Sequence, residues 1–549
     1  MRTLLFSCLL FNSFFAIFFS ISNLVLVSGH CQSDQRQLLL ELNLSSSFRS
    51  TTFATPLGRL MKWNQTKDCC SWEGISCDAG GHVIGLDLSI RGISCPLDVS
   101  SSLFRFQHLQ RLNLAFNWFK TSFLTGFDKL ENLSYLNLSY FDFKRQIPVE
   151  ISRLTRLVTL DLSAFPICKT SLKLEKPNLE MLVQNLTRLR FLYLDGITIS
   201  ATGNELCRAL LPFTKLQVLS MSDCYLSGPI PSCSSFKNLG ELNLGDNQLS
   251  GTIHSTDWSG LSKLEIVDLS NSKRSGTIPP TLFGIQSLRR LFLSQNQFNG
   301  SIGDLHVQLK LPKPNINSGI WILDLHGNQL QGQVPTLPSY ATYLDYSDNN
   351  FSFVLPAHIG DSLQFTSFFS LSNNNIQGRI PESLCNHTKL QVQSHHFFGK
   401  LQRLESLDLS RNSLGGEIPL QLANLNFLLF LNVSNNKLVG PIPTSTQLQT
   451  FSKASFENNA GLCGPPLKTM EHYSWNHLSV EVGFIFGFGI IIVPLIYWKR
   501  WRIWYFERID RALSRLFPRL GRETKKHGRR EKQNQRRRTQ QQLGLRSRE

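Results

Sequence analysis

Apolar residues return in a fixed pattern along most of the chain. The motif Leu-x-Leu, with apolar replacements, begins at fourteen places, several of them 24 or 25 residues apart: Leu86, Leu112, Leu136, Leu160, Leu192, Leu219, Leu242, Val267, Leu291, Leu323, Leu344, Phe369, Leu407 and Leu431. Side chains alternate between the two faces of a strand, so both apolar residues of a motif face one way. One motif cannot bury that face alone, whereas stacked copies can. The pattern predicts a solenoid in which each repeat adds a short strand to a parallel sheet.

Polar and turn residues follow each motif at regular positions. An Asn stands three residues after the second apolar position in many repeats, at Asn117, Asn247, Asn296, Asn328, Asn349, Asn374, Asn412 and Asn436. Its carboxamide can satisfy backbone groups between coils. Cys224 takes the same position and is predicted to be a buried residue of this series. Many repeats continue to Gly-x-Ile-Pro, where Gly permits a bend and Pro ends strand pairing.

The two ends of the chain predict its topology. Arg2 precedes a long apolar run that ends at small residues near Gly29, which is typical of a signal peptide over 1–29; an uncleaved anchor is the alternative. A second uncharged apolar run, Val482 to Trp498, predicts a membrane helix over 480–498; a buried core helix is the alternative. Lys499 and Arg500 favour a cytoplasmic tail. We expect a single-pass type I protein of the plasma membrane with its ectodomain outside.

Charge is concentrated in the tail. Residues 499–549 hold 18 Lys and Arg against 5 Asp and Glu, which is most of the net charge of +17. This placement favours contact with an anionic membrane surface and argues against nucleic acid as a partner. The overall composition, 41% hydrophobic and 17% charged, excludes a wholly disordered chain.

Glycosylation sequons support the topology. All nine Asn-x-Ser/Thr sequences lie in the predicted exterior: Asn43, Asn64, Asn132, Asn137, Asn185, Asn299, Asn350, Asn386 and Asn432. The chain has no nucleotide-binding loop, no HExxH and no kinase signature. We therefore expect a protein that is not an enzyme and that has no catalytic residue, cofactor or metal site.

The recurring form LxxLxLxxNxLxGxIP resembles the plant-specific subfamily of leucine-rich repeats. The cysteine-containing segment 63–77 and the segment 456–467 resemble the N-terminal and C-terminal caps of that subfamily. With a signal peptide, one span and no kinase, the chain resembles a plant leucine-rich-repeat receptor-like protein. Segments 172–179 and 506–511 resemble the Verticillium-wilt-resistance type in particular.

The resemblance implies an α/β-type solenoid, a leucine-rich-repeat horseshoe with a concave parallel β-sheet, plus one transmembrane helix. The expected parts are a signal peptide (1–29), N-terminal cap (30–85), about fourteen repeats (86–450), C-terminal cap and juxtamembrane segment (451–479), span (480–498) and basic tail (499–549). It also implies disulfides between Cys31 and Cys69 and between Cys70 and Cys77. A zinc site is the rival interpretation of these cysteines, although no Cys-x-x-Cys pair is present.

The same resemblance implies a defence receptor that binds an extracellular, pathogen-derived protein or peptide. Its signalling partners would be an adaptor and a co-receptor, both leucine-rich-repeat receptor kinases. A developmental peptide receptor and a wall-facing inhibitor of microbial polygalacturonase are the alternatives. In this chain the repeat after Leu371 is irregular, with a junction at 385–400 where relatives carry further repeats and an island. We interpret this as internal shortening, which predicts a weak interface and early proteolysis near Gln391 to Lys400.

Two sets of residues are candidates for contacts. Strand alternation predicts that Phe116, Tyr135, Tyr140, Phe191 and Tyr193 face the concave side, where aromatic residues can anchor a ligand; paving of a glycosylated surface is the alternative. In the span, Gly483 and Gly487 lie four residues apart and would let a partner helix approach closely.

Overall fold

The computed structural model describes residues 29–44, 63, 65–93, 99–117, 125–140, 146–164, 172–230, 234–254, 258–302, 319–334, 337–338, 340–385, 404–445, 447–467 and 508. The chain divides into two units, Met1–Leu467 and Lys468–Glu549. The predicted signal peptide, the predicted span with Gly483 and Gly487, and segment 386–403 of the junction lie outside the described residues. Among the residues described, no helix has the length and apolar character needed to cross a membrane.

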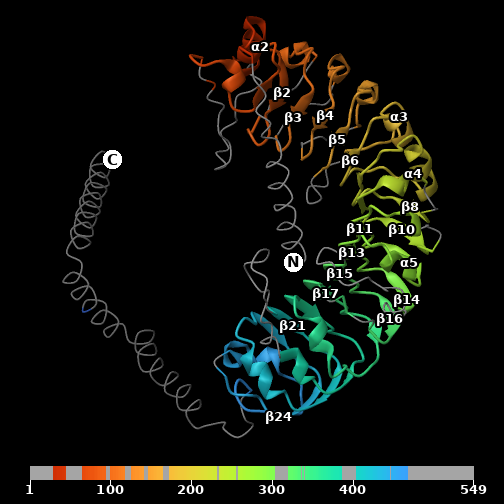
Figure 1. The fold of residues 1–549 in the computed structure, drawn as a ribbon, viewed down its shortest axis with the longest axis vertical. Helices are drawn as coiled ribbons and strands as arrows, with labels where there is room; N and C mark the ends of the chain where they lie inside the picture. The colour runs from red at the N-terminus through yellow and green to blue at the C-terminus, as the bar shows by residue number, and fades with distance from the viewer. Residues whose placement is uncertain are drawn as a thin grey trace, which may run out of the picture. The chain divides into compact units, whose positions relative to one another are not determined.

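One long parallel sheet runs through the first unit. Its strands follow one another in sequence order along a curve (Figure 1). They are β1 (Ile75–Cys77), β2 (Val83–Asp87), β3 (Arg111–Asn113), β4 (Tyr135–Asn137), β5 (Thr159–Asp161), β6 (Phe191–Tyr193), β7 (Val218–Ser220), β9 (Glu241–Asn243), β11 (Ile266–Asp268), β13 (Arg290–Phe292), β15 (Ile322–Asp324), β17 (Tyr343–Asp345), β19 (Phe368–Ser370), β21 (Ser406–Asp408) and β23 (Phe430–Asn432). We call this the concave sheet.

The register of the concave sheet follows the leucine motif. Leu86 is opposite Leu112, Leu112 is opposite Leu136, and the same pairing continues to Leu431 on β23. Every one of the fourteen first positions of the motif lies on a strand of this sheet, and each is buried. The structure therefore confirms the predicted solenoid.

Further strands form on the other side of the coils. A six-stranded sheet contains β8 (Ser227–Gly228), β10 (Gln248–Gly251), β12 (Lys273–Gly276), β14 (Gln297–Ser301), β16 (Gln329–Gly332) and β18 (Asn350–Phe351). We call this the outer sheet, because β8, β10, β14 and β16 lie on the outer side of β11, β13 and β15 (Figure 1). A four-stranded sheet continues the series with β20 (Gln377–Gly378), β22 (Ser413–Gly416), β24 (Lys437–Pro441) and β25 (Gly461–Cys463).

Short helices complete the coils. The α-helices are α2 (Ser33–Leu44), α3 (Leu179–Val183), α4 (Gly203–Leu210) and α5 (Pro280–Phe283). Helix α4 begins with a capping box, in which Thr202 and Glu205 satisfy each other's backbone N–H groups. Single 3₁₀ turns are η2 (Cys69–Ser71), η3 (Ser102–Arg105), η4 (Phe127–Lys129), η5 (Val149–Arg153), η6 (Ser234–Asn238), η7 (Trp258–Gly260), η8 (Ile359–Ser362), η9 (Glu382–Cys385), η10 (Leu420–Asn424), η11 (Leu448–Thr450) and η12 (Lys453–Ser455).

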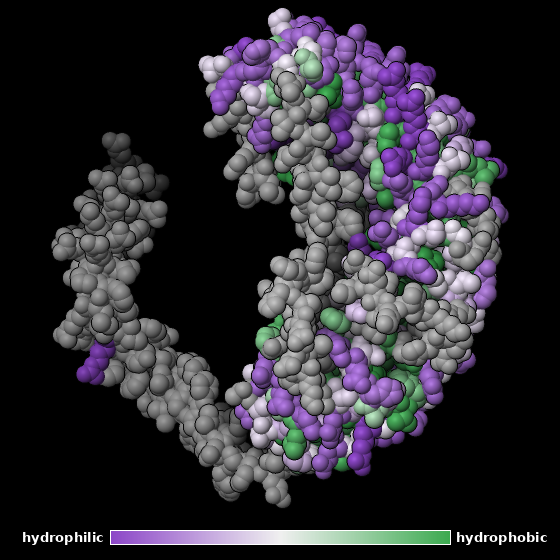
Figure 2. Space-filling model, in the orientation of Figure 1, coloured by the Kyte–Doolittle hydropathy of each residue, from purple (hydrophilic) through white to green (hydrophobic). Residues whose placement is uncertain are grey.

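The apolar side chains of the coils meet in one continuous core between the sheets. The motif leucines are almost fully buried there. On the face seen in Figure 2, hydrophilic residues dominate and hydrophobic residues surface in small, separate patches. Burial of this leucine face against neighbouring coils is the main force that holds the array together.

The asparagine series ties neighbouring coils together. In Asn296, Nδ2 donates to the carbonyls of Leu269, Leu293 and Ser294 at 2.8, 3.2 and 3.0 Å, and Oδ1 accepts the N–H of Arg274 at 3.1 Å. Asn328 and Asn436 make the same kinds of contact, donating to carbonyls of their own coil and the preceding one and accepting an N–H from the preceding coil. These carboxamides therefore link the end of a concave strand to a strand on the other side of the coils. Cys224, in the same position, is buried and donates its thiol to the carbonyl of Leu194 at 3.0 Å, as the sequence predicts for a structural residue.

One repeat departs from this scheme. Ser272 stands at the asparagine position, and Arg274 stands where neighbouring repeats have Leu249 and Phe298. The side chain of Arg274 is 1% exposed, and its Nε and Nη2 atoms have no hydrogen-bond partner among the described residues. Burial lowers the pKa of Arg274 to about 10. This coil therefore holds a buried cation without a facing acid, which is costly.

The concave sheet continues across the irregular junction. Strand β19 pairs directly with β21, with Phe369 opposite Leu407, in the same three-residue register as elsewhere. Asn412 also spans the junction, because its Nδ2 donates to the carbonyl of Leu371 at 2.9 Å and its Oδ1 accepts the N–H of Ile376 at 3.0 Å. The contacts of the described residues give no support to the predicted weak interface.

The N-terminal cap covers the first coil. Strand β1 pairs antiparallel with β2, and α2 packs against η3. Trp63 and Trp72 stack with ring centroids 5.3 Å apart beneath the cap. The cap contains the disulfides Cys31–Cys69 and Cys70–Cys77, the pairing that the resemblance implies. Because all four sulfurs are bonded in pairs, the zinc interpretation of these cysteines is wrong.

Candidate ligand-binding face

Two residues of each concave strand point away from the core. They flank the buried leucine, so the outward side chains form rows that run from strand to strand. In one row Tyr135, Thr159 and Phe191 are successive register partners on β4, β5 and β6. In the next row Asn137, Asp161 and Tyr193 are partners on the same strands. Three of the five predicted ligand-face residues, Tyr135, Phe191 and Tyr193, therefore lie within one patch of three strands.

The other two predicted residues form a separate pair. Phe116 and Tyr140 follow β3 and β4, and their rings stack with centroids 4.4 Å apart. Both have left-handed backbone, with φ of 57° and 55°, and both are half-buried. Their N–H groups donate to the carbonyls of Ser139 and Ser163 in the next coil. Phe116 and Tyr140 lie in the turns that follow β3 and β4. Their stacked rings are therefore at one margin of the concave sheet.

Cations lie over two of the aromatic rings. The guanidinium of Arg111 is 4.6 Å from the ring centroid of Tyr135, and that of Arg190 is 5.9 Å from the ring of Phe191. Contacts of this length fall within the range of cation–π attraction. These rings are therefore held in place before any ligand arrives, which lowers the entropic cost of binding.

A set of carboxyl groups on the concave side, near the aromatic patch, was missed in the sequence. Burial raises the pKa of Asp161 to about 6, of Asp195 to about 7 and of Asp268 to about 6, and it also raises the pKa of Glu241. The signal was present, because Leu-Asp-Leu-Ser recurs at Asp161 and Asp408. The alternation of side chains along each strand predicts that these acids face the concave side, as it does for the tyrosines.

Most of these acids also have a local structural role. Asp161 and Asp268 accept the N–H of the serine two residues later, at 3.0 and 2.9 Å, and so close the turn after the strand. Asp195 differs, since it accepts from the next coil: the hydroxyl of Ser220 at 2.7 Å and the N–H of Ser222 at 2.7 Å. Glu241, which acts on the pKa of both Tyr193 and Asp195, brings a fourth carboxyl group to the same region.

A second acidic group lies farther along the sheet. Nδ1 of His326 is 2.7 Å from Oδ1 of Asp324, and Asp345 lies close enough for the three groups to share one cation. Burial opposes protonation of His326, but the hydrogen bond and the charges of both aspartates raise its pKa above the ordinary value. The Asp324 and Asp345 side chains also accept the N–H groups of His326 and Ser347, which accounts for their placement without an ion.

The predicted glycosylation sites differ in how exposed their side chains are. Asn185, Asn299 and Asn350 are exposed, and Asn43 and Asn132 are half-buried. Asn137 is only 4% exposed, and both Asn137 and Asn432 use Oδ1 to accept the N–H of the residue two later. Asn64 and Asn386 lie outside the described residues. The glycosylation itself stays a prediction.

Two further observations concern cysteines that the sequence left unassigned. Cys207, within α4, is disulfide-bonded. Cys463 on β25 is a free and exposed thiol.

Comparison with known proteins agrees with this architecture. Residues 33–78 match the leucine rich repeat N-terminal domain, and residues 215–236, 367–387 and 403–425 match the leucine rich repeat. A crystal structure of a TDR receptor superposes with a TM-score of 0.54 at 27% identity, over 69% of this chain and 63% of that one. Among sequences, Receptor-like protein 49 of Arabidopsis thaliana is 32% identical over 477 residues, which is 78% of this chain.

The chain is a leucine-rich-repeat protein similar to plant receptor-like proteins. Receptor-like protein 6 of Arabidopsis thaliana is 33% identical over 49% of this chain, and Receptor-like protein Cf-9 of Solanum pimpinellifolium is 34% identical over 42%. The matches cover 54% of Receptor-like protein 49 and 28% of Receptor-like protein 6, so the chain spans about half or less of the length of these relatives.

Proposed function

We propose that this chain is the ligand-binding part of a plant cell-surface receptor, and that it binds an extracellular protein or peptide on the concave sheet between β3 and β11. The observation that carries the proposal is the aromatic patch next to the carboxyl groups of Asp161, Asp195 and Glu241. Tyrosine and phenylalanine supply large contact areas at low entropic cost and are frequent anchors in interfaces.

The acids determine what kind of ligand would fit. Asp161, Asp195 and Glu241 stand within one region, and burial disfavours their ionised forms. A Lys or Arg side chain placed there would stabilise the ionised carboxylates and would itself be stabilised. We therefore propose a ligand with an apolar or aromatic anchor for Tyr140 and Tyr193 and at least one basic group for the acids.

The defence role rests on resemblance. The wilt-resistance-like segments support a pathogen-derived ligand, with a developmental peptide as the competing source. We propose, from the resemblance to receptor-like proteins, that signalling passes through an adaptor and a co-receptor receptor kinase. We propose that Gly483 and Gly487 provide the contact in the membrane. Replacing both by Leu should preserve insertion and reduce co-purification with the adaptor kinase; wild-type recovery would exclude this contact.

A secreted form of residues 30–467 tests the binding proposal. We expect it to retain a component from microbial culture filtrate rather than from plant apoplastic peptides. Alanine at Tyr140 and Tyr193 should weaken binding by about 1–2 kcal/mol each. Tyr225→Ala is the matched control, because Tyr225 is 53% exposed but follows Cys224, off the concave rows. Equal affinity of the double variant and the control would reject the proposed face.

A further inference from the structure

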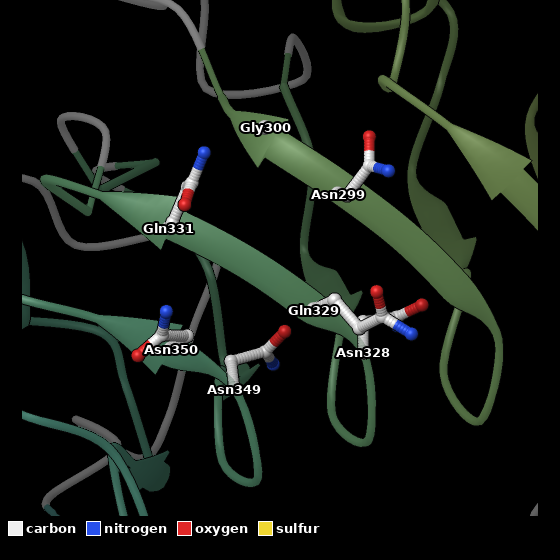
Figure 3. A pocket seen from close by; sticks show the side chains of 7 residues that line it. All are labelled: Asn299, Gly300, Asn328, Gln329, Gln331, Asn349 and Asn350. Atoms are coloured by element: carbon white, nitrogen blue, oxygen red, sulfur yellow. The ribbon is translucent and has the colours of Figure 1, made fainter.

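The outer sheet carries a groove with a chemistry unlike that of the concave sheet. The groove crosses β14, β16 and β18 and has a cavity volume of about 650 Å³. Its outward residues are four exposed carboxamides, Asn299, Gln329, Gln331 and Asn350. Asn299, Gln331 and Asn350 stand on the same side of three adjacent strands (Figure 3).

The strand register explains how the carboxamides come together. Asn299 is paired with Gln329, and Gln331 is paired with Asn350. Their neighbours along the strands, Phe298, Leu330 and Phe351, point inward and are fully buried. The polar side chains therefore point outward. The arrangement is set by the core and is therefore rigid.

The four carboxamides are available for a ligand. None of them has a side-chain hydrogen bond to another residue within the described part of the chain. Asn328 and Asn349, which also line the groove, differ because their carboxamides are used by the asparagine series. Each free carboxamide offers two N–H donors and one acceptor oxygen.

The lining selects the class of ligand. Among the described residues that line the groove, none has a charged side chain, so a charged ligand would lose water without gaining a partner from them. The same described residues expose no large apolar side chain, so an apolar ligand gains little from them. The hydroxyl and acetamido groups of a sugar both donate and accept hydrogen bonds, as the carboxamides of this groove do. We propose that the outer face of β14, β16 and β18 is a carbohydrate-binding surface.

The sequence suggests one source for this carbohydrate. Asn299 and Asn350 are each the first residue of a sequon, Asn299-Gly300-Ser301 and Asn350-Phe351-Ser352. They flank the Gln329–Gln331 strand at a separation on the order of 10 Å, given the spacing of about 4.8 Å between strands. A glycan attached to either Asn would begin inside the groove and lie across the two glutamines. A free oligosaccharide is the other source of the same chemistry.

The first arm of the test concerns the attached glycan. The full chain is expressed in plant cells, and the release of glycans by an endoglycosidase under native conditions is followed for each glycopeptide by mass spectrometry. The double variant Gln329→Ala/Gln331→Ala should speed release from Asn299 and Asn350 at least five-fold. Release from Asn185, which is exposed near α3, should stay the same and serves as the internal control.

The second arm concerns a free sugar. The variant Asn299→Gln/Asn350→Gln keeps the carboxamides but cannot be glycosylated there. It should bind N,N′-diacetylchitobiose in a titration followed by NMR, and adding Gln329→Ala/Gln331→Ala should weaken that binding at least ten-fold. Gln248→Ala, an exposed carboxamide elsewhere on the same sheet, is the control. Thermal melts establish that each variant is folded.

The two arms together decide the proposal. An effect in the first arm identifies the attached glycan as the occupant, and an effect in the second alone identifies a free oligosaccharide. If the glutamine variant alters neither glycan release nor chitobiose binding, the groove does not bind carbohydrate and the proposal is overturned.

Discussion

The concave and outer sheets are built on one array of coils, and they present opposite chemistry in two different stretches of it. The concave sheet displays stacked aromatic rings and half-buried acids between β3 and β11, whereas the outer sheet displays neutral carboxamides on β14, β16 and β18. Both sheets share one leucine core and one asparagine series. The difference teaches that the core and the series fix the backbone, which leaves the outward residues of each sheet free to serve separate ligands.

The largest expected effect comes from breaking the link between the two sheets. Asn296→Ala removes three donated bonds and the acceptor for the N–H of Arg274, and it leaves buried carbonyls unpaired. We expect the free energy of unfolding to fall by about 2–4 kcal/mol, measured by chemical denaturation. Gln297→Ala, at the exposed neighbouring position, should be nearly silent. Equal effects of the two variants would show that the series does not join the sheets.

The second-largest expected effect is an increase in the free energy of unfolding rather than a decrease. Arg274→Leu replaces an unpaired buried cation by the residue type that neighbouring coils carry at this position, so we expect stabilisation by roughly 1–4 kcal/mol. Lys273→Leu, at the exposed adjacent position, controls for the loss of charge alone. A lower melting temperature for Arg274→Leu would mean that the cation has a partner outside the described residues.

The acids of the concave sheet should make the free energy of unfolding depend on pH. Burial raises the pKa of Asp161, Asp195 and Asp268 to about 6, 7 and 6. Because an unfolded Asp titrates near 4, the folded chain holds more protons between pH 4 and 7, and the free energy of unfolding falls as pH rises through that window. We expect the free energy of unfolding, measured by chemical denaturation, to be larger at pH 5 than at pH 7.5, by on the order of 1 kcal/mol per carboxyl group.

A matched pair of variants localises this pH dependence. Asp195→Asn should make the pH dependence shallower, because it removes the carboxyl group with the highest pKa of the three and leaves Asp161 and Asp268 in place. Asp361→Asn, an acid in η8 away from the concave rows, should leave the profile unchanged. A slope in Asp195→Asn equal to that of the unmodified chain would assign the titration to other groups.

The sequence predicts where the strands of the concave sheet lie. It does not predict which side chains come together on the concave and outer sheets. The leucine period predicts fourteen of the fifteen strands of the concave sheet, all but β1, because each leucine must be buried against the next coil. The Asn series follows from the same period, and Cys224 could be placed by it. The stacking of Phe116 on Tyr140 depends on the left-handed turn after each strand, which the period does not specify. The grouping of Asp161, Asp195 and Glu241 depends on how residues from three repeats align, and the unpaired Arg274 shows that the core tolerates an exception that no pattern would predict.

The central claim is that the ligand lies on the concave sheet between β3 and β11. Hydrogen exchange of the secreted ectodomain, with and without the retained ligand, tests this most directly. The account predicts slower exchange in peptides that cover 111–140 and 190–245, with no change in peptides of the outer sheet over 297–301 and 329–332. Protection confined to the outer sheet, or to strands after β13, would contradict it.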